Sequence, residues 1–171
     1  AVASYTVPFE VITQLLVGVT AVATVALPSI TQQLRQDHGL ARQTFRRWLL
    51  RVVVGMAALA GGVALWLPWA LPLWLGNALP AESIVIGRWL CLGVWINAIG
   101  AMHFAWLHAQ GRFRETALLH LLELPLYVVL LLLLLRDFGV VGAAIAWTAR
   151  VTLDTAALIW LARTHRRAGP G

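Results

Sequence analysis

The stretch VVGAAIAWTARVTLDTAALIWL, residues 140–161, decides the fold. Its length of about 22 residues is enough for a helix, at about 1.5 Å per residue, to cross a hydrocarbon core of roughly 30 Å. Two charged residues, Arg150 and Asp154, interrupt it four positions apart, so a helix places them on one face. An unpaired arginine near the middle of the membrane raises the free energy of insertion by at least ~2.5–3.5 kcal/mol. Arg150 should therefore face protein or water and not lipid.

The rest of the chain shares this membrane character. Of the 171 residues, 60% are apolar, against ~45–50% in ordinary soluble domains, and the mean hydropathy is +0.79. Apolar spans run over about residues 8–30, 48–71, 83–107, 116–135 and 140–161. They predict an all-α, polytopic membrane bundle of about five transmembrane helices, with residues 1–171 forming one transmembrane helical domain. Because the chain starts without Met and without a signal peptide, we expect a fragment of a longer protein.

The basic residues predict the topology. All 13 are arginines, and ten of them fall in the connections after the first and third spans and after the last. The positive-inside rule places those connections in the cytoplasm, with the N-terminus of the chain outside and the C-terminus inside. Because the arginines are split among connections and form no single basic face, no nucleic-acid partner is predicted despite the net charge of +6. Phosphate recognition remains open, since the guanidinium fork suits it.

Local predictions follow for the segment before the second span and for the span itself. Residues 40–51, LARQTFRRWLLR, are either an amphipathic helix lying along the inner membrane surface or a simple basic loop. The glycines of this span, Gly55, Gly61 and Gly62, would allow a neighbouring helix to approach closely.

The fourth span also carries charge inside the membrane. His120 and Glu123 share a helical face three residues apart. A short connection makes the fourth and fifth spans antiparallel neighbours, and Glu123 and Asp154 then lie at matching depths. Glu123, Arg150 and Asp154 are therefore expected to cluster. In one interpretation Arg150 and Asp154 are a purely structural pair. In the other, Arg150 holds an anionic group in a watery cavity, with Glu123 or Asp154 as counter-charge or protonatable site.

Two further polar residues are candidates for such a cavity. Asn97 and His103 lie in the third span. A hydrogen bond to a neighbouring helix is the alternative role for each. No catalytic motif such as HExxH, GxSxG, CxxC or a P-loop is present, and the histidines fall in separate spans. The sequence therefore predicts no catalytic residue, metal site or cofactor.

Several stretches resemble the oligosaccharide flippases of the multidrug/oligosaccharidyl-lipid/polysaccharide exporter superfamily. The similarity covers nearly the whole chain. It is carried by YTVPFEVITQLLVGVTAVATVALPSITQQ at 5–33, by LWLG at 73–76 with HAQGR at 108–112, and by HLLELPLYVVLLLLLLRDFGVVGAAIAWTARVTLD at 120–154. The Gly-Ala-Ala-Ile-Ala-Trp run followed by Arg150 and Asp154 is the most distinctive part.

The resemblance implies a function for the longer protein. Such a flippase is built of two helical bundles, and this chain would be the C-terminal part, missing the N-terminal bundle and one helix of the second bundle. It would move a polyprenyl-pyrophosphate-linked oligosaccharide across the cell inner membrane, among membrane lipids, from the cytoplasmic to the outer leaflet. Ion exchange would drive it, and Arg150 could serve as a cationic cavity residue. The alternatives are a drug or lipid exporter of the same superfamily, a membrane-embedded polysaccharide-biosynthesis enzyme and a non-transporting assembly subunit.

Overall fold

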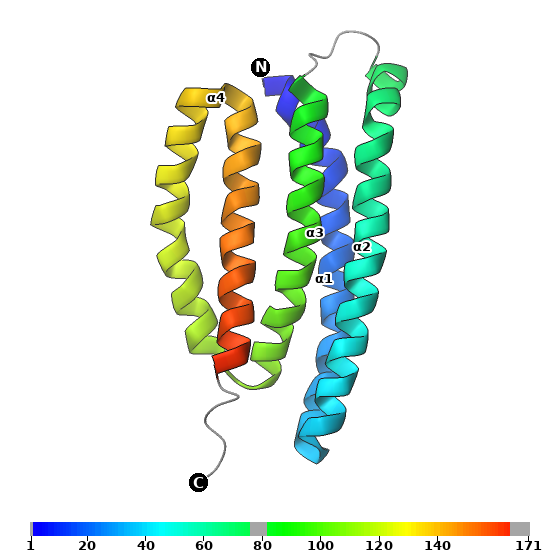
Figure 1. Cartoon of the computed structure of the whole chain (residues 1–171), viewed down its shortest axis with the longest axis vertical. Coiled ribbons are helices and arrows are strands. Elements are labelled where there is room, and N and C mark those ends of the chain that lie inside the picture. Colours follow the sequence, from blue (N-terminus) through cyan, green and yellow to red (C-terminus); the bar gives the residue numbers. More distant parts are fainter. Residues whose placement is uncertain (1, 76–81, 165–171) are drawn as a thin grey trace.

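The computed structural model describes residues 2–75 and 82–164, without the side chains of residues 2–8, 11, 13, 74 and 75. It contains four helices: α1, Val2–Gln36; α2, His38–Leu75; α3, Glu82–Ala109; and α4, Phe113–Thr164 (Figure 1). Each helix has a stretch long and apolar enough to cross a membrane. The described ranges contain no strand, so the predicted all-α, polytopic helical bundle is confirmed.

The helix α4 is a hairpin of two spans. Gly139 interrupts it with φ 58° and ψ −139°, and the two halves run antiparallel on either side of this residue (Figure 1). A backbone with positive φ favours glycine because no Cβ is present to clash. Close behind the turn, a Cβ on Gly142 would collide with the carbonyl oxygen of Leu134. With this turn the chain has five antiparallel segments, as the spans predict.

The segment 40–51 is helical and is not a loop. It belongs to α2, which continues without a break from His38 to Leu75, and it is not a separate helix before the second span. Asp37 caps the start of this helix: its Oδ1 accepts hydrogen bonds from the backbone N–H groups of Gly39, at 2.6 Å, and Leu40, at 3.4 Å. The loop interpretation is wrong because hydropathy cannot distinguish a polar extension of a membrane helix from a separate polar segment.

The helices α1 and α2 extend beyond the bundle at one end. They have 35 and 38 residues, which correspond to about 50–57 Å, well over the ~30 Å of the hydrocarbon core. Their connected ends lie beyond the ends of α3 and α4 (Figure 1). Arg35, Arg42, Arg46 and Arg47 belong to this extension and are exposed. We refer to this side of the bundle as the arginine-rich end.

The helix α3 is the centre of the bundle and contacts α1, α2 and α4. Its buried glycines admit side chains of the second half of α4. Added Cβ atoms would meet Trp147 at Gly93 and Thr155 at Gly100. Thr148 and Thr155 donate hydrogen bonds to α3 carbonyls, those of Trp89 at 2.9 Å and Ile96 at 3.2 Å.

The glycines predicted to allow close helix packing are not the ones that do so. A Cβ on Gly55, Gly61 or Gly62 would have nothing within 4 Å, so that prediction is wrong. Close approach occurs instead at glycines of α3 and α4. The reason is the position of α3 in the middle, where neighbouring helices pack tightly against its glycines. Gly61 and Gly55 instead line open grooves that α2 forms with α3 and with α1.

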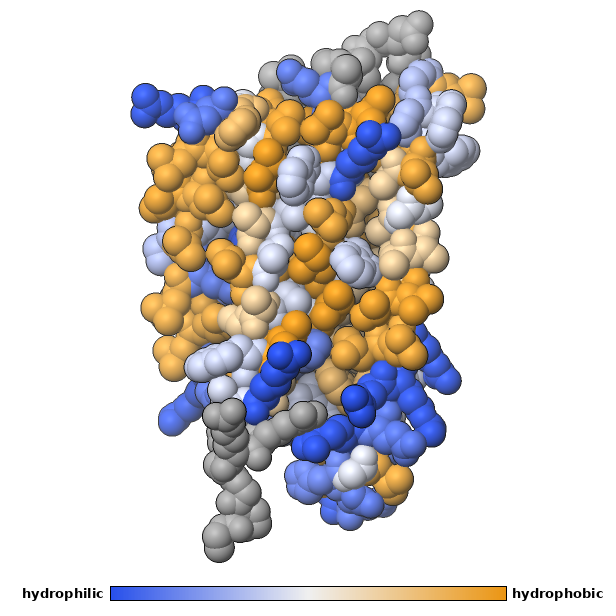
Figure 2. Space-filling model, in the orientation of Figure 1, coloured by the Kyte–Doolittle hydropathy of each residue, from blue (hydrophilic) through white to orange (hydrophobic). Residues whose placement is uncertain are grey.

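The face of the bundle seen in Figure 2 is apolar over most of its height and hydrophilic at the arginine-rich end. The first half of α4 is strongly exposed, with 71% of Leu122 and 66% of Leu121 accessible. Contiguous apolar surface of this extent is unfavourable in water and is matched by acyl chains. The chain is therefore a multi-pass membrane protein.

Candidate functional site

The hairpin of α4 brings its charged residues to one depth. Glu123 lies sixteen residues before Gly139 and Asp154 fifteen after it, so a turn at Gly139 sets them side by side on adjacent segments. His120 is one helical turn from Glu123 on the same face. This register is the one that the short connection predicts.

Three of these side chains form an acidic cluster, His120, Glu123 and Asp154. His120 Nδ1 lies 3.4 Å from Asp154 Oδ1 and 3.6 Å from Glu123 Oε2. These separations are ion-pair distances and are too long for good hydrogen bonds. Within the described residues, the facing atoms of all three side chains are buried without a hydrogen-bond partner. Two carboxylates in a weakly polar environment repel one another unless a cation or a proton lies between them.

The acidic cluster has the composition of a cation site. One ligand atom from each of His120, Glu123 and Asp154 lies within 4.8 Å of the others. Glu123 is 8% exposed, so its carboxylate is shielded from bulk water. The sequence predicted no metal site because the histidines fall in separate spans. The proximity of Glu123 and Asp154 was predicted. What the sequence did not predict is that His120 joins these two carboxylates as a third candidate ligand.

Arg150 is placed between the two halves of α4. Its guanidinium carbon lies 5.2 Å from the centre of the Tyr127 ring, a cation–π distance. The side chain is half-buried and lines a cavity of about 20 Å³ between the halves, together with Glu123, Leu126, Tyr127, Leu130 and Leu153. In the described part of the chain no carboxylate lies within 4.0 Å of Arg150, and its Nε has no hydrogen-bond partner. Its charge therefore faces protein, without the direct pair to Asp154 of the structural interpretation.

The two candidates on α3 lie apart from the acidic cluster. Asn97 is half-buried on this helix. His103 is 8% exposed, its Nδ1 lies 2.8 Å from the carbonyl oxygen of Ile99, and its ring meets Phe45 edge-on at 5.3 Å. The intrahelical bond to Ile99 is a structural role for this histidine, yet the same side chain also lines a cavity.

That cavity, the basic cavity, opens at the arginine-rich end between α2, α3 and α4 and has a volume of about 260 Å³. Its polar lining consists of Arg42, Arg46, His103, Gln110 and Arg163, and its apolar lining of Phe45, Leu49, Trp106, Ile159 and Ala162. Sequence reasoning found His103 alone. For Arg42 and Arg46 a signal was their i, i+4 spacing on a helical face, whereas Gln110 and Arg163 had none.

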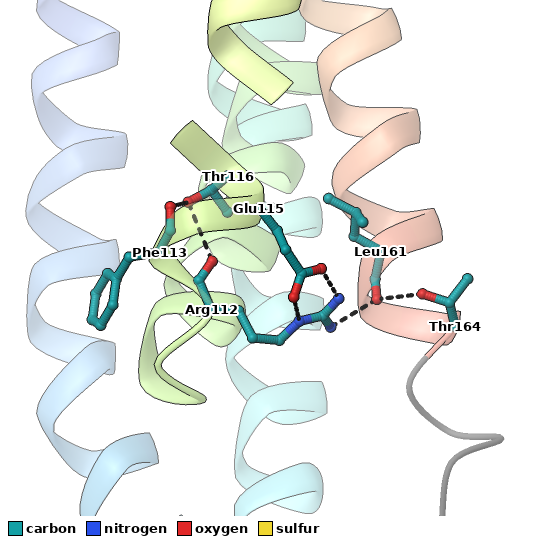
Figure 3. A network of polar contacts seen from close by, with 6 residues as sticks. All are labelled: Arg112, Phe113, Glu115, Thr116, Leu161 and Thr164. Atoms are coloured by element: carbon teal, nitrogen blue, oxygen red, sulfur yellow. Dashed lines mark hydrogen bonds and ion pairs between the residues drawn. The ribbon is translucent and has the colours of Figure 1, made fainter. Parts of the chain in front are cut away.

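A polar network fixes the helix ends beside the basic cavity. Arg112 pairs with Glu115 through two contacts and donates from Nη1 to the carbonyl oxygen of Leu161 at 2.9 Å (Figure 3). It thereby ties the α3–α4 turn to the last turns of α4. The turn itself is a Schellman motif, in which Gly111, at φ 75°, and Arg112 donate to the carbonyls of His108 and Leu107. This explains the Gly-Arg pair of the HAQGR motif.

Comparison with known proteins identifies a relative. Over 160 residues the chain is 31% identical to a protein of Shigella flexneri named "Putative O-antigen transporter". The alignment covers 94% of this chain and 38% of that relative, so the chain spans well under half of the relative's length. No family model matches the chain, and no solved structure matches it.

The fold and its long apolar helices define a polytopic helical membrane protein. The match confirms the family relationship predicted from the sequence motifs: the chain is related to an O-antigen transporter, as expected of a member of the O-antigen and oligosaccharide flippase family.

Proposed function

We propose that the chain is part of a flippase that moves a polyprenyl-pyrophosphate-linked oligosaccharide from the cytoplasmic to the outer leaflet of the inner membrane. The alignment of nearly the whole chain with an O-antigen transporter is the observation that carries this proposal. In this proposal the described helices form part of one bundle, and helices from a preceding N-terminal bundle complete the pathway. The arginine-rich end lies in the cytoplasm, as the positive-inside rule favours.

The chemistry of the bundle supports this role. A flippase must accept a charged head group while the lipid tail stays in the bilayer, and this needs polar groups inside an otherwise apolar wall. Arg150 and the acidic cluster supply them, since ionisable residues at membrane depth mark ion and substrate pathways. We assign no enzymatic step to the chain.

The acidic cluster is proposed as the coupling site of this cycle. Its carboxylates, Glu123 and Asp154, require a proton or a small cation for charge balance beside His120. Binding of that cation from one side and release to the other would couple an ion gradient to lipid movement. Because Arg150 is one turn from Asp154, cation binding at the acidic cluster would change the electrostatic potential at its guanidinium group.

The test is complementation. A strain lacking its own O-antigen transporter is given the full-length protein that carries this chain, and long-chain lipopolysaccharide is measured on gels together with outer-leaflet carrier-linked glycan. Restored glycan on the outer face is expected. Insertion of the protein without any glycan export, but with lowered drug accumulation, would instead identify an exporter of the same superfamily.

A further inference from the structure

The basic cavity concentrates positive charge that the described carboxylates do not pair with. Arg42 and Arg46 stand one turn apart on α2, and Arg163 approaches from the last turn of α4. Among the described residues no carboxylate lies within salt-bridge distance of these three guanidinium groups. Like charges held around one hollow repel one another, so an anion in the hollow would relieve a repulsion that the protein alone leaves.

Guanidinium groups specify the chemistry of that anion. Their planar forks donate pairs of hydrogen bonds to phosphate oxygens, and Gln110 and His103 add neutral polar groups to the same lining. Three separate arginines can surround a tetrahedral group from several sides. A phosphate group thus fits the polar part of the basic cavity better than a single carboxylate does.

The other half of the lining indicates what carries the phosphate. Leu49, Ile159 and Ala162 give the basic cavity an apolar part beside its arginines. Free phosphate would leave this surface without a partner, whereas a lipid presents an apolar segment next to its phosphate. The basic cavity also lies at the ends of α3 and α4, the level at which head groups meet acyl chains.

We propose that the basic cavity binds the phosphate group of a membrane lipid at the arginine-rich end. The phosphate can belong to an anionic phospholipid or to the diphosphate of a carrier lipid. The second source rests on the proposed function, because only a flippase for such lipids would meet it as cargo. The first source requires no transport activity.

The experiment compares two triple variants of the purified full-length protein in nanodiscs of phosphatidylcholine. The cavity variant combines Arg42→Gln, Arg46→Gln and Arg163→Gln. The control variant combines Arg35→Gln, Arg47→Gln and Arg114→Gln, which remove the same charge from exposed positions at the same end that do not line the cavity. Binding of phosphatidylglycerol, of a polyprenyl diphosphate and of the uncharged polyprenol is measured by native mass spectrometry.

We expect at least one phosphate lipid to bind the cavity variant at least tenfold more weakly than it binds the parent. Its binding to the control variant, and the binding of polyprenol, should change less than twofold. The phosphate lipid affected identifies the source. Equal binding of both phosphate lipids to parent and cavity variant overturns the proposal, and so does an equal loss in the control variant. If the triple variant does not fold, Arg42→Gln and Arg46→Gln are measured singly, each with an expected loss of about threefold. The proposed function is judged separately, by glycan export in the complementation assay.

Discussion

At the residue scale, Arg150 shows how a membrane interior decides the partners of a charge. The i, i+4 spacing predicts Arg150 and Asp154 on one helical face, and a salt bridge is the simplest consequence. The structure instead stacks Arg150 on Tyr127 and turns Asp154 toward His120. The pairing follows from the register of the α4 hairpin, which supplies each side chain with a neighbour from the opposite half.

Removal of the Arg150 charge tests its role in transport. In the full-length protein, Arg150→Ala should reduce glycan export at least tenfold while membrane insertion is retained, because the substitution removes the cation and leaves an apolar helix that inserts readily. Arg150→Lys should restore little export if a planar, bidentate contact matters. Export is measured in the complementation assay, with Tyr127→Phe as a control that keeps the ring beneath the charge. Normal export by Arg150→Ala would restrict this residue to a structural role.

The acidic cluster gives a second prediction at this scale. Glu123→Gln and Asp154→Asn keep the shape of each side chain but remove its charge, so neither can exchange a proton with the membrane gradient. Both should lower export at least tenfold and abolish its sensitivity to a protonophore or to sodium replacement. Asp137→Asn, at an exposed position beside the α4 turn, serves as the control. If export by both cluster variants still depends on the ion gradient, the proposed coupling role of Glu123 and Asp154 is wrong.

At the element scale, the α4 hairpin depends on a glycine whose backbone touches the opposite segment. Gly142→Ala adds a Cβ that would collide with the carbonyl oxygen of Leu134, and a backbone atom cannot move as a flexible side chain can. We expect the variant to lose about 1–3 kcal/mol of stability. Gly62→Ala, with open space around its Cβ, is the matched control and should be neutral or slightly stabilising. Thermal unfolding in detergent distinguishes the two, and equal melting temperatures would contradict the tight turn.

The turn of the α4 hairpin could be predicted from the sequence, whereas the helix bounds and the glycine contacts could not. Residues 139–142, Gly-Val-Val-Gly, lie between two apolar runs, which predicts a turn and an antiparallel pair. The same hydropathy signal misplaces the start of α2, because a polar helical extension and a loop have similar compositions. It also selects Gly55, Gly61 and Gly62 where Gly93 and Gly100 make the contacts. Glycine spacing within one helix does not reveal which face a neighbour covers.

At the scale of the whole molecule, the five segments leave the two ends of the described chain on opposite sides of the bundle (Figure 1). Topology can therefore be read from three positions. In a Cys91→Ser background, cysteines replacing Arg47 and Arg114 mark the arginine-rich end, and one replacing Arg136 marks the other end; all three positions are exposed. A membrane-impermeant maleimide added to intact cells should label only position 136. Labelling of positions 47 and 114 from outside would reverse the orientation.

The family and the fold class could be predicted at this scale, whereas the basic cavity could not. Its arginines come from positions 42, 46 and 163, on helices far apart in the sequence, and only the packing of α2 and α4 around the end of α3 assembles them. Periodicity places residues on the faces of a helix, but it carries no information on which faces converge from distant parts of a chain.

The register of the α4 hairpin has a consequence for biogenesis. The segment that carries Arg150 and Asp154 is costly to release alone from the translocon, whereas its companion segment of leucines partitions readily into lipid. Since Tyr127 and His120 on the companion face those charges, the pair should leave the translocon together as a helical hairpin. The leucine segment is synthesised first and would wait beside the lateral gate until Arg150 has emerged from the ribosome.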